Sequence, residues 1–404
     1  ERGVAEMPTA FVATYGSGKP VIGFLAEYDA LPGLSQKAGS TSKEPVIEGG
    51  PGHGCGHNLL GAANAAAAIA IKQVMEKYTL RGAVKLFGCP AEEGTLGKVY
   101  MARAGLFEGV DACFAWHPSA QNAVRTGSSL AKNEFEVVFR GKTAHAASGP
   151  WNGRSALDAV ELMSVGVNYL REHIEEQVRI HSVVTDGGKA PNIVPDRASA
   201  WYYVRDLDRK RLEAVYERVL DCARGAALMT GTTLEVNVIT GVYEYLPNLT
   251  LSEVLDRNLR EIGAPRFSGE DHAFARGVQR SLGVPENGMC VEIDPFGNNS
   301  NSGASTDVAD VSWIVPTSGE LAVATNPIGS PGHSWAVTSS SGSPAGLKGM
   351  LVAAKALSSG GIETLLNPEI AQKAKMEFAE KTRGFTYRSA LPEGLKPPVR
   401  ERKN

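Results

Sequence analysis

Metal-binding side chains gather in four short segments of this sequence. They are a thiol, imidazoles and carboxylates, each beside glycine or proline or at the end of an apolar stretch: Cys55, His57, Glu92, Glu93, His117 and His333. Thiolate, imidazole and carboxylate are ligand types that borderline divalent metals such as Zn²⁺ accept. The pattern therefore predicts a metal site built from segments that are far apart in the chain.

The two adjacent glutamates, Glu92 and Glu93, favour a hydrolytic site. Such a site needs one carboxylate on the metal and a second that is free to take a proton from the attacking water. Adjacent glutamates usually mark a solvated face, but these two follow a buried apolar strand and precede Gly94. We therefore interpret the chain first as a metal-dependent hydrolase.

Each segment taken alone also has a simpler interpretation. Cys55 could be a structural cysteine in a glycine-rich turn, and His53 beside it is a competing ligand. His117 could be a histidine satisfied at the end of a strand, and His333 could be a loop residue. Four such coincidences in one chain weigh against the simpler interpretations.

Length and composition are those of a soluble enzyme of two domains. The chain has 404 residues, of which 43% are hydrophobic and 21% charged. Its net charge of −3 gives no reason to expect nucleic acid or an anionic membrane as a partner, and no apolar run is long enough to span a bilayer. The five cysteines are odd in number and show no framework of pairs, which indicates reduced thiols and a cytoplasmic location.

The elements that must position these side chains alternate between strands and helices. Strands are predicted at residues 9–15, 20–26, 83–88 and 111–116, and helices at 59–78, 97–104, 251–262 and 343–358. The glutamate pair and His117 come at or just after the carboxyl ends of strands. This placement fits an α/β domain with a mostly parallel sheet flanked by helices.

The middle of the chain has a different rhythm. Its predicted order is strand, helix, strand, strand, helix, strand, at residues 135–140, 155–173, 179–185, 198–205, 207–229 and 233–239. This is the order of a ferredoxin-like βαββαβ domain. We therefore expect residues 131–242 to form an inserted lid or dimerisation domain, and residues 1–130 and 243–404 to form a discontinuous catalytic domain.

Five motifs carry a resemblance to a known family. They are EYDALPG, GCGHN, PAEEG, WHP and GHS, at residues 27–33, 54–58, 90–94, 116–118 and 332–334. In this order they resemble the aminoacylase/carboxypeptidase family of binuclear metallohydrolases. They are most similar to the branch that holds the auxin-conjugate hydrolases and p-aminobenzoyl-glutamate hydrolase.

The resemblance implies roles at the matching positions. Two divalent ions, Zn²⁺ or Mn²⁺, would be bound by Cys55, His57, Glu93, His117 and His333. Glu92 would be the general base, and Asp29 would orient a metal ligand from behind. Many relatives in other branches have a histidine two residues before that aspartate, where this chain has Glu27, and Cys55 is the compensating ligand.

The resemblance also implies residues that bind substrate. His145 would reach from the inserted domain, often across a dimer interface, to stabilise the oxyanion. Asn192 matches a substrate-binding asparagine of the same domain. Arg205 is a weaker candidate for binding a substrate carboxylate, and Thr306 is a candidate for the wall of the pocket. For His145 and Arg205, the alternatives of a loop histidine and an exposed strand-end charge remain.

The expected activity is hydrolysis of the amide bond in an N-acyl amino acid conjugate, most similar to that of aminobenzoyl-glutamate hydrolase. The expected assembly is a homodimer, possibly with a companion subunit. A dipeptidase or aminoacylase with the same metal site is the alternative. A catalytically silent protein that only binds is the second alternative, although the ligands and the base are all present.

Overall fold

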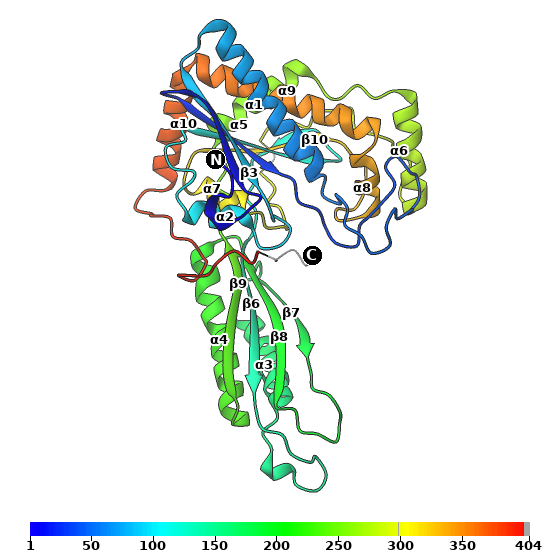
Figure 1. The fold of residues 1–404 in the computed structure, drawn as a ribbon, viewed down its shortest axis with the longest axis vertical. Coiled ribbons are helices and arrows are strands. Elements are labelled where there is room, and N and C mark those ends of the chain that lie inside the picture. The colour runs from blue at the N-terminus through cyan, green and yellow to red at the C-terminus, as the bar shows by residue number, and fades with distance from the viewer. Residues whose placement is uncertain (298, 400–404) are drawn as a thin grey trace.

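The computed structural model describes residues 1–297 and 299–399 of the chain. A six-stranded sheet lies at the centre of the larger part of the molecule (Figure 1). Its strands, in spatial order, are β1 (Phe11–Ser17), β3 (Gly82–Cys89), β2 (Val21–Glu27), β4 (Ala112–Ser119), β10 (Thr317–Ala324) and β5 (Ala123–Arg125). Strands β3, β2, β4 and β10 are mutually parallel, and β1 and β5 are antiparallel edges. The predicted, mostly parallel sheet is confirmed.

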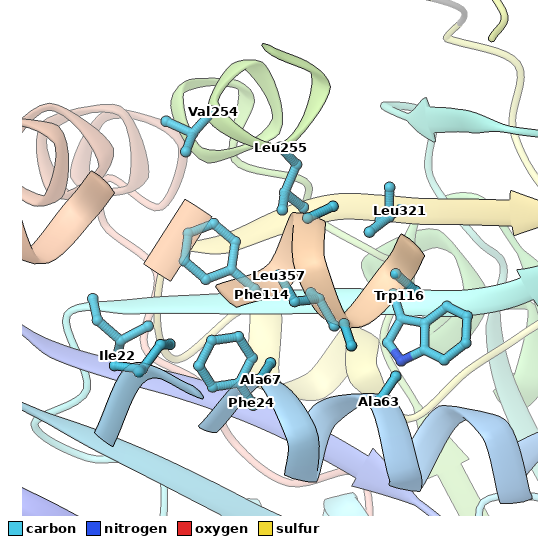
Figure 2. Close-up of a cluster of buried hydrophobic side chains, with 14 of the residues drawn as sticks. Ile22, Phe24, Ala63, Ala67, Phe114, Trp116, Val254, Leu255, Leu321 and Leu357 are labelled. Carbon is cyan, nitrogen blue, oxygen red and sulfur yellow. The ribbon is translucent and has the colours of Figure 1, made fainter. Parts of the chain in front are cut away.

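Helices cover both faces of this sheet because the strands are apolar on both sides. On one face, Ile22 and Phe24 of β2 pack with the helices α1 (His57–Tyr78), α5 (Leu249–Ile262), α9 (Pro344–Leu366) and α10 (Pro368–Lys381). Figure 2 shows this core, in which Phe24 and Phe114 lie between α1 and α9. On the other face, Val21 and Leu25 pack with α2 (Gly97–Arg103) and α7 (Val308–Ser312). The alternation along β2 is the two-residue period of a strand.

A second unit extends away from this sheet and is seen at the bottom of Figure 1. Its elements are β6 (Ala131–Arg140), α3 (Ala156–Leu170), β7 (Arg179–Asp186), β8 (Arg197–Asp206), α4 (Arg209–Thr230) and β9 (Thr233–Val242). The sheet is antiparallel, in the order β7-β8-β6-β9, and its buried core comes from residues 131–227. We call residues 131–242 the four-stranded unit. Its element order is the one predicted from the sequence.

Several elements differ from the prediction. Strand β10 and the helices α6 (Gly269–Leu282) and α10 were not predicted. Helix α9 ends at Leu366, because Gly360 and Gly361 lie inside it instead of ending it. A Cβ on Gly361 would be 2.6 Å from Ile71 Cδ1, so this glycine permits close packing of α9 on α1.

The remaining helix of the larger part is α8 (Trp335–Ser341). Among the described residues, no helix is both long and apolar enough to cross a membrane. The last five residues of the predicted range 243–404 lie outside the described residues.

Candidate metal centre

The candidate site lies at the carboxyl ends of the parallel strands. Glu27 is the last residue of β2, Glu92 and Glu93 follow β3, and His117 lies in β4. The turn before α1 carries Cys55, and its Gly56 has a φ of 78°. A Cβ on Gly56 would be 2.8 Å from Pro118 Cβ, so a glycine is needed where this turn meets β4.

The structure brings the five predicted ligands together in two groups. The ligand atoms of Cys55, His57 and His117 all lie within 4.8 Å of one another. The same is true of Cys55, Glu93 and His333. The thiol of Cys55 belongs to both groups, and its Sγ is 3.4 Å from His117 Nε2. The arrangement therefore offers two neighbouring positions that share one sulfur atom.

The last of these ligands, His333, is held in an unusual backbone conformation. Its φ is 52°, in the left-handed region that residues other than glycine seldom adopt. Its Nε2 is 3.3 Å from Glu93 Oε2, although 59% of the side chain is exposed. Residues kept in this region against their preference are concentrated at functional sites.

Hydrogen bonds turn the Nε2 atoms of two histidines toward the cluster. His57 Nδ1 is 2.9 Å from Asp29 Oδ1, and His117 Nδ1 is 2.7 Å from the carbonyl oxygen of Pro118. Because an ionised carboxylate and a carbonyl can only accept, Nδ1 donates in both rings and Nε2 keeps its lone pair. Asp29 also accepts from the backbone N–H of Glu93 at 2.9 Å. It thus orients a histidine and the neighbouring glutamate, as predicted for a carboxylate behind the ligands.

The unpaired atoms of the cluster fit divalent metal ions. His57 Nε2 and Glu93 Oε1 are buried, lie 3.9 Å apart and form no hydrogen bond among the described residues. Buried polar atoms are rarely left without a partner. A thiolate, imidazoles and a carboxylate in one cluster form a donor set that suits Zn²⁺ or another borderline divalent ion.

The cluster favours the thiolate form of Cys55. Burial alone would raise the pKa of this thiol, but His117, with further hydrogen bonds from His333 and His57, lowers it to about 3. The thiolate is the form that binds metal. The pKa of Glu93 is raised to about 7, by burial first and by the negative charge of Cys55 second.

The second glutamate, Glu92, lies apart from the shared sulfur. It groups instead with Glu27 and His57, whose ligand atoms are within 4.8 Å of its own. Burial and then the negative charges of Glu27 and Asp307 raise the pKa of Glu92 well above its ordinary value. A carboxyl group with a raised pKa beside a metal cluster has the properties of a general base and acid.

A buried lysine near this glutamate was missed in the sequence analysis. Lys98 has 0% of its side chain exposed, and its Nζ is 2.6 Å from Glu27 Oε1 and 2.5 Å from Asp307 Oδ1. Burial would lower the pKa of Lys98, but Asp307 and Glu27 raise it well above its ordinary value. The only signal in the sequence is a lysine inside the small and apolar run 97–102, all of which is buried.

A cavity of about 350 Å³ opens beside the cluster. It is lined by Cys55, Glu92, Glu93, His117 and His333 from the larger part of the molecule, and by two predicted substrate-binding residues, Arg205 and Thr306. Serine side chains form much of the remaining wall: Ser128, Ser129, Ser300, Ser302 and Ser305. The cavity is therefore polar and has the metal ligands on one side.

Arg205 brings an unpaired positive charge to this cavity. Its guanidinium lies 5.3 Å from the ring centre of Tyr203, and its Nε is buried without a hydrogen bond. No ion pair of Arg205 is present among the described residues. A half-buried guanidinium without an acidic partner is suited to binding a carboxylate of a ligand.

The other two predicted residues, His145 and Asn192, are not on the wall of this cavity. They lie together in exposed loops of the four-stranded unit, where His145 pairs with Ile193 and Ala146 N–H donates to the carbonyl of Asn192. His145 Nδ1 accepts from the N–H groups of Ala147 and Ser148, both at 3.2 Å. The imidazole therefore carries its proton on Nε2. One chain does not bring these two residues to the cluster.

Comparison with known families matches residues 23–316 to the model of peptidase family M20/M25/M40. The chain is 39% identical to one of the two subunits of p-aminobenzoyl-glutamate hydrolase of Escherichia coli (strain K12), over 98% of this chain and 88% of that protein. It is 31% identical to the Xaa-Arg dipeptidase of Mus musculus, over 92% of this chain and 78% of that protein.

A solved structure shares the fold. It is that of the YXEP protein of Bacillus subtilis, a dinuclear metal-binding peptidase of the M20 family. The TM-score is 0.56, at 20% identity, with 90% of this chain and 87% of that chain covered.

Proposed function

Because this chain belongs to peptidase family M20/M25/M40 and is a metal-dependent hydrolase that acts on amide bonds, we propose that the cavity beside Cys55 hydrolyses an N-acyl amino acid conjugate. The observation that carries the proposal is the joint presence of two ligand groups, a separate glutamate and an unpaired arginine around one cavity. p-Aminobenzoyl-glutamate, after which the Escherichia coli relative is named, is the first candidate substrate.

The proposed ligands are Cys55, His57 and His117 for one ion, and Cys55, Glu93 and His333 for the other. Two divalent ions, Zn²⁺ or Mn²⁺, would supply Lewis acidity toward the amide carbonyl and lower the pKa of water. Asp29 holds His57 and the backbone of Glu93 in place for this set.

Glu92 moves the proton in the proposed reaction. Its carboxylate takes a proton from the attacking water, whose oxygen forms the new bond to the amide carbon. The carbon–nitrogen bond then breaks, and Glu92 returns the proton to the nitrogen so that a neutral amine leaves. A carboxyl group whose pKa is raised by burial is suited to both steps.

Arg205 binds the carboxylate of the amino acid, and Thr306 contributes to the wall of the same cavity. The similarity to an Xaa-Arg dipeptidase keeps a dipeptidase, or an aminoacylase, as the alternative activity. A silent protein that only binds its ligand would not need the base, and Glu92 is present beside a complete set of ligands.

We also propose that residues 131–242 form a ferredoxin-like domain that acts as a lid and forms a homodimer. Its edge strand β7 exposes Val183 and Val184, and the outer face of α3 exposes Leu162, Val165 and Tyr169, the last to 76%. An apolar face beside an open sheet edge can pair with a second copy of itself. Such pairing would let the partner subunit's His145 and the partner subunit's Asn192 reach the cavity, where the Nε2–H could donate to the oxyanion.

The dimer proposal is tested by mixing two inactive variants. His145→Ala and Glu92→Gln proteins should each lose most turnover, and a mixed dimer should regain it because one of its two sites is intact. No recovery in mixed dimers detected by mass would contradict the proposal that His145 acts across the interface. A hetero-assembly remains the other form of partnership, since two Escherichia coli relatives are named as different subunits of one hydrolase.

Five unpaired cysteine thiols support our proposal that the protein works in the cytoplasm. The activity itself is tested by a hydrolysis assay on p-aminobenzoyl-glutamate, N-acyl amino acids and dipeptides, before and after treatment with a chelator. The proposal expects amide cleavage that the chelator abolishes and added Zn²⁺ or Mn²⁺ restores. Cleavage that the chelator leaves unchanged would contradict it.

A further inference from the structure

A buried group of two carboxylates and one ammonium lies against the proposed metal centre. Glu27, Lys98 and Asp307 come from β2, α2 and the residue before α7, and all three are almost completely buried. Lys98 Nζ contacts both carboxylates, and the backbone N–H of Lys98 also donates to Asp307 Oδ2 at 2.8 Å. Asp307 therefore holds the lysine at two points, and the lysine in turn holds Glu27.

The other oxygen of Glu27 faces a proposed metal ligand. Glu27 Oε2 is 3.2 Å from His57 Nε2, the atom that would bind metal. The ligand atoms of Glu27, His57 and Glu92 lie within 4.8 Å of one another, which is close enough for them to hold an ion together. The cluster thus has more carboxylates near His57 than a catalytic ion requires.

A catalytic metal site differs from a structural one in the number of protein ligands. Catalytic zinc commonly takes three ligands from the protein and keeps one position free for water or substrate, whereas structural sites are closed. If Glu27 bound the ion at His57, it would fill the position that the reaction needs. The contact between Lys98 and Glu27 Oε1 restrains this carboxylate on the side away from His57.

We propose that Lys98 is a positioning residue of the hydrolytic site, which keeps Glu27 in a buried ion pair and so prevents it from becoming a metal ligand. This inference rests on the proposed function and on the ligands proposed there. The role of Asp307 is to hold the ammonium where it meets Glu27.

The inference is tested with the Lys98→Met variant, loaded with Co²⁺ in place of the native ions. The visible absorption of Co²⁺ weakens when the number of its ligands rises, so it reports coordination independently of turnover. We expect the same number of bound ions as in the wild type and weaker absorption per Co²⁺. We also expect kcat to fall by about 10-fold or more, with a smaller change in KM. Adding Glu27→Gln to this variant should restore the absorption and part of kcat, because an amide is a poorer ligand than a carboxylate.

Two further variants keep the test decisive if Lys98→Met does not fold. Lys98→Met with Asp307→Asn removes one positive and one negative charge, and should show the same weakened absorption. Glu27→Gln alone should keep both the number of ions and the absorption of the wild type. Loss of an ion in Glu27→Gln would overturn the inference, because Glu27 would then be a ligand in the wild type.

The outcomes separate this inference from the proposed function. Unchanged Co²⁺ absorption in folded Lys98→Met, beside a wild type that binds metal, would overturn the inference alone. A wild-type protein that binds no divalent metal would overturn the proposed function and the inference with it.

Discussion

Replacing Arg205 by alanine should lower kcat/KM for a substrate that carries a carboxylate. The guanidinium lies on the wall of the cavity and has no acidic partner among the described residues, so its hydrogen-bonding capacity is available to a ligand. A hydrogen bond to a charged group contributes about 1.5–3 kcal/mol. Because 1.36 kcal/mol corresponds to a factor of ten, Arg205→Ala should lower kcat/KM by roughly 10- to 150-fold.

The assay compares p-aminobenzoyl-glutamate with an analogue whose α-carboxylate is a carboxamide. The variant should lose the stated factor on the acid and little on the amide. Its thermal stability should not fall, because the native guanidinium is partly desolvated without an ion pair. Arg140→Ala is a matched control, since Arg140 forms an exposed ion pair with Glu235 away from the cavity and should leave kcat/KM unchanged. Equal losses on both substrates would refute the assignment of Arg205 to the carboxylate.

Three other substitutions test separate parts of the account. Glu92→Gln should keep its bound metal and lose about 100-fold or more of kcat, and near-normal turnover would remove Glu92 from the role of base. Asp29→Asn should weaken metal affinity by about 10- to 100-fold in a chelator competition, whereas unchanged affinity would show that His57 needs no orienting carboxylate. Asp111→Asn should lower the free energy of unfolding at neutral pH by about 1–3 kcal/mol, because Asp111 accepts from the N–H of Val21 and pairs with Lys19 and Lys375. Burial would raise the pKa of Asp111, but these contacts lower it overall, so its stabilisation is present above the pKa in the unfolded chain and is lost as the pH falls through the folded value. Denaturant unfolding at several pH values should therefore show a shallower loss in acid for the variant, and identical curves would contradict this.

The sequence was informative about the ligands because each belongs to a short motif next to glycine or proline. Cys55, His57 and His117 are fixed within a few residues of turns and strand ends, so local sequence predicts their convergence. The order of elements in residues 131–242 was equally predictable, because amphipathic periods and turns are local properties.

Other features depend on packing between distant segments. The ion pairs of Lys98 need β2, α2 and the chain before α7 to meet, and its own neighbourhood resembles an ordinary buried helix. Strand β10 was missed because Ser318, Gly319 and Glu320 interrupt its apolar pattern, although the strand lies between β4 and β5. The separation of His145 from the cavity also lay beyond local sequence, since it is set by how far the four-stranded unit extends.

The central claim is that two divalent ions share Cys55 in this cavity. The most direct measurement is the number of Zn²⁺ or Mn²⁺ ions bound per chain by elemental analysis, in the wild type and in Cys55→Ala, after loading and removal of free metal. We predict two ions per chain in the wild type and a lower number in the variant, because the thiolate belongs to both ligand groups. A wild type that retains no metal, or a Cys55→Ala protein that retains two ions with unchanged affinity, would contradict the account.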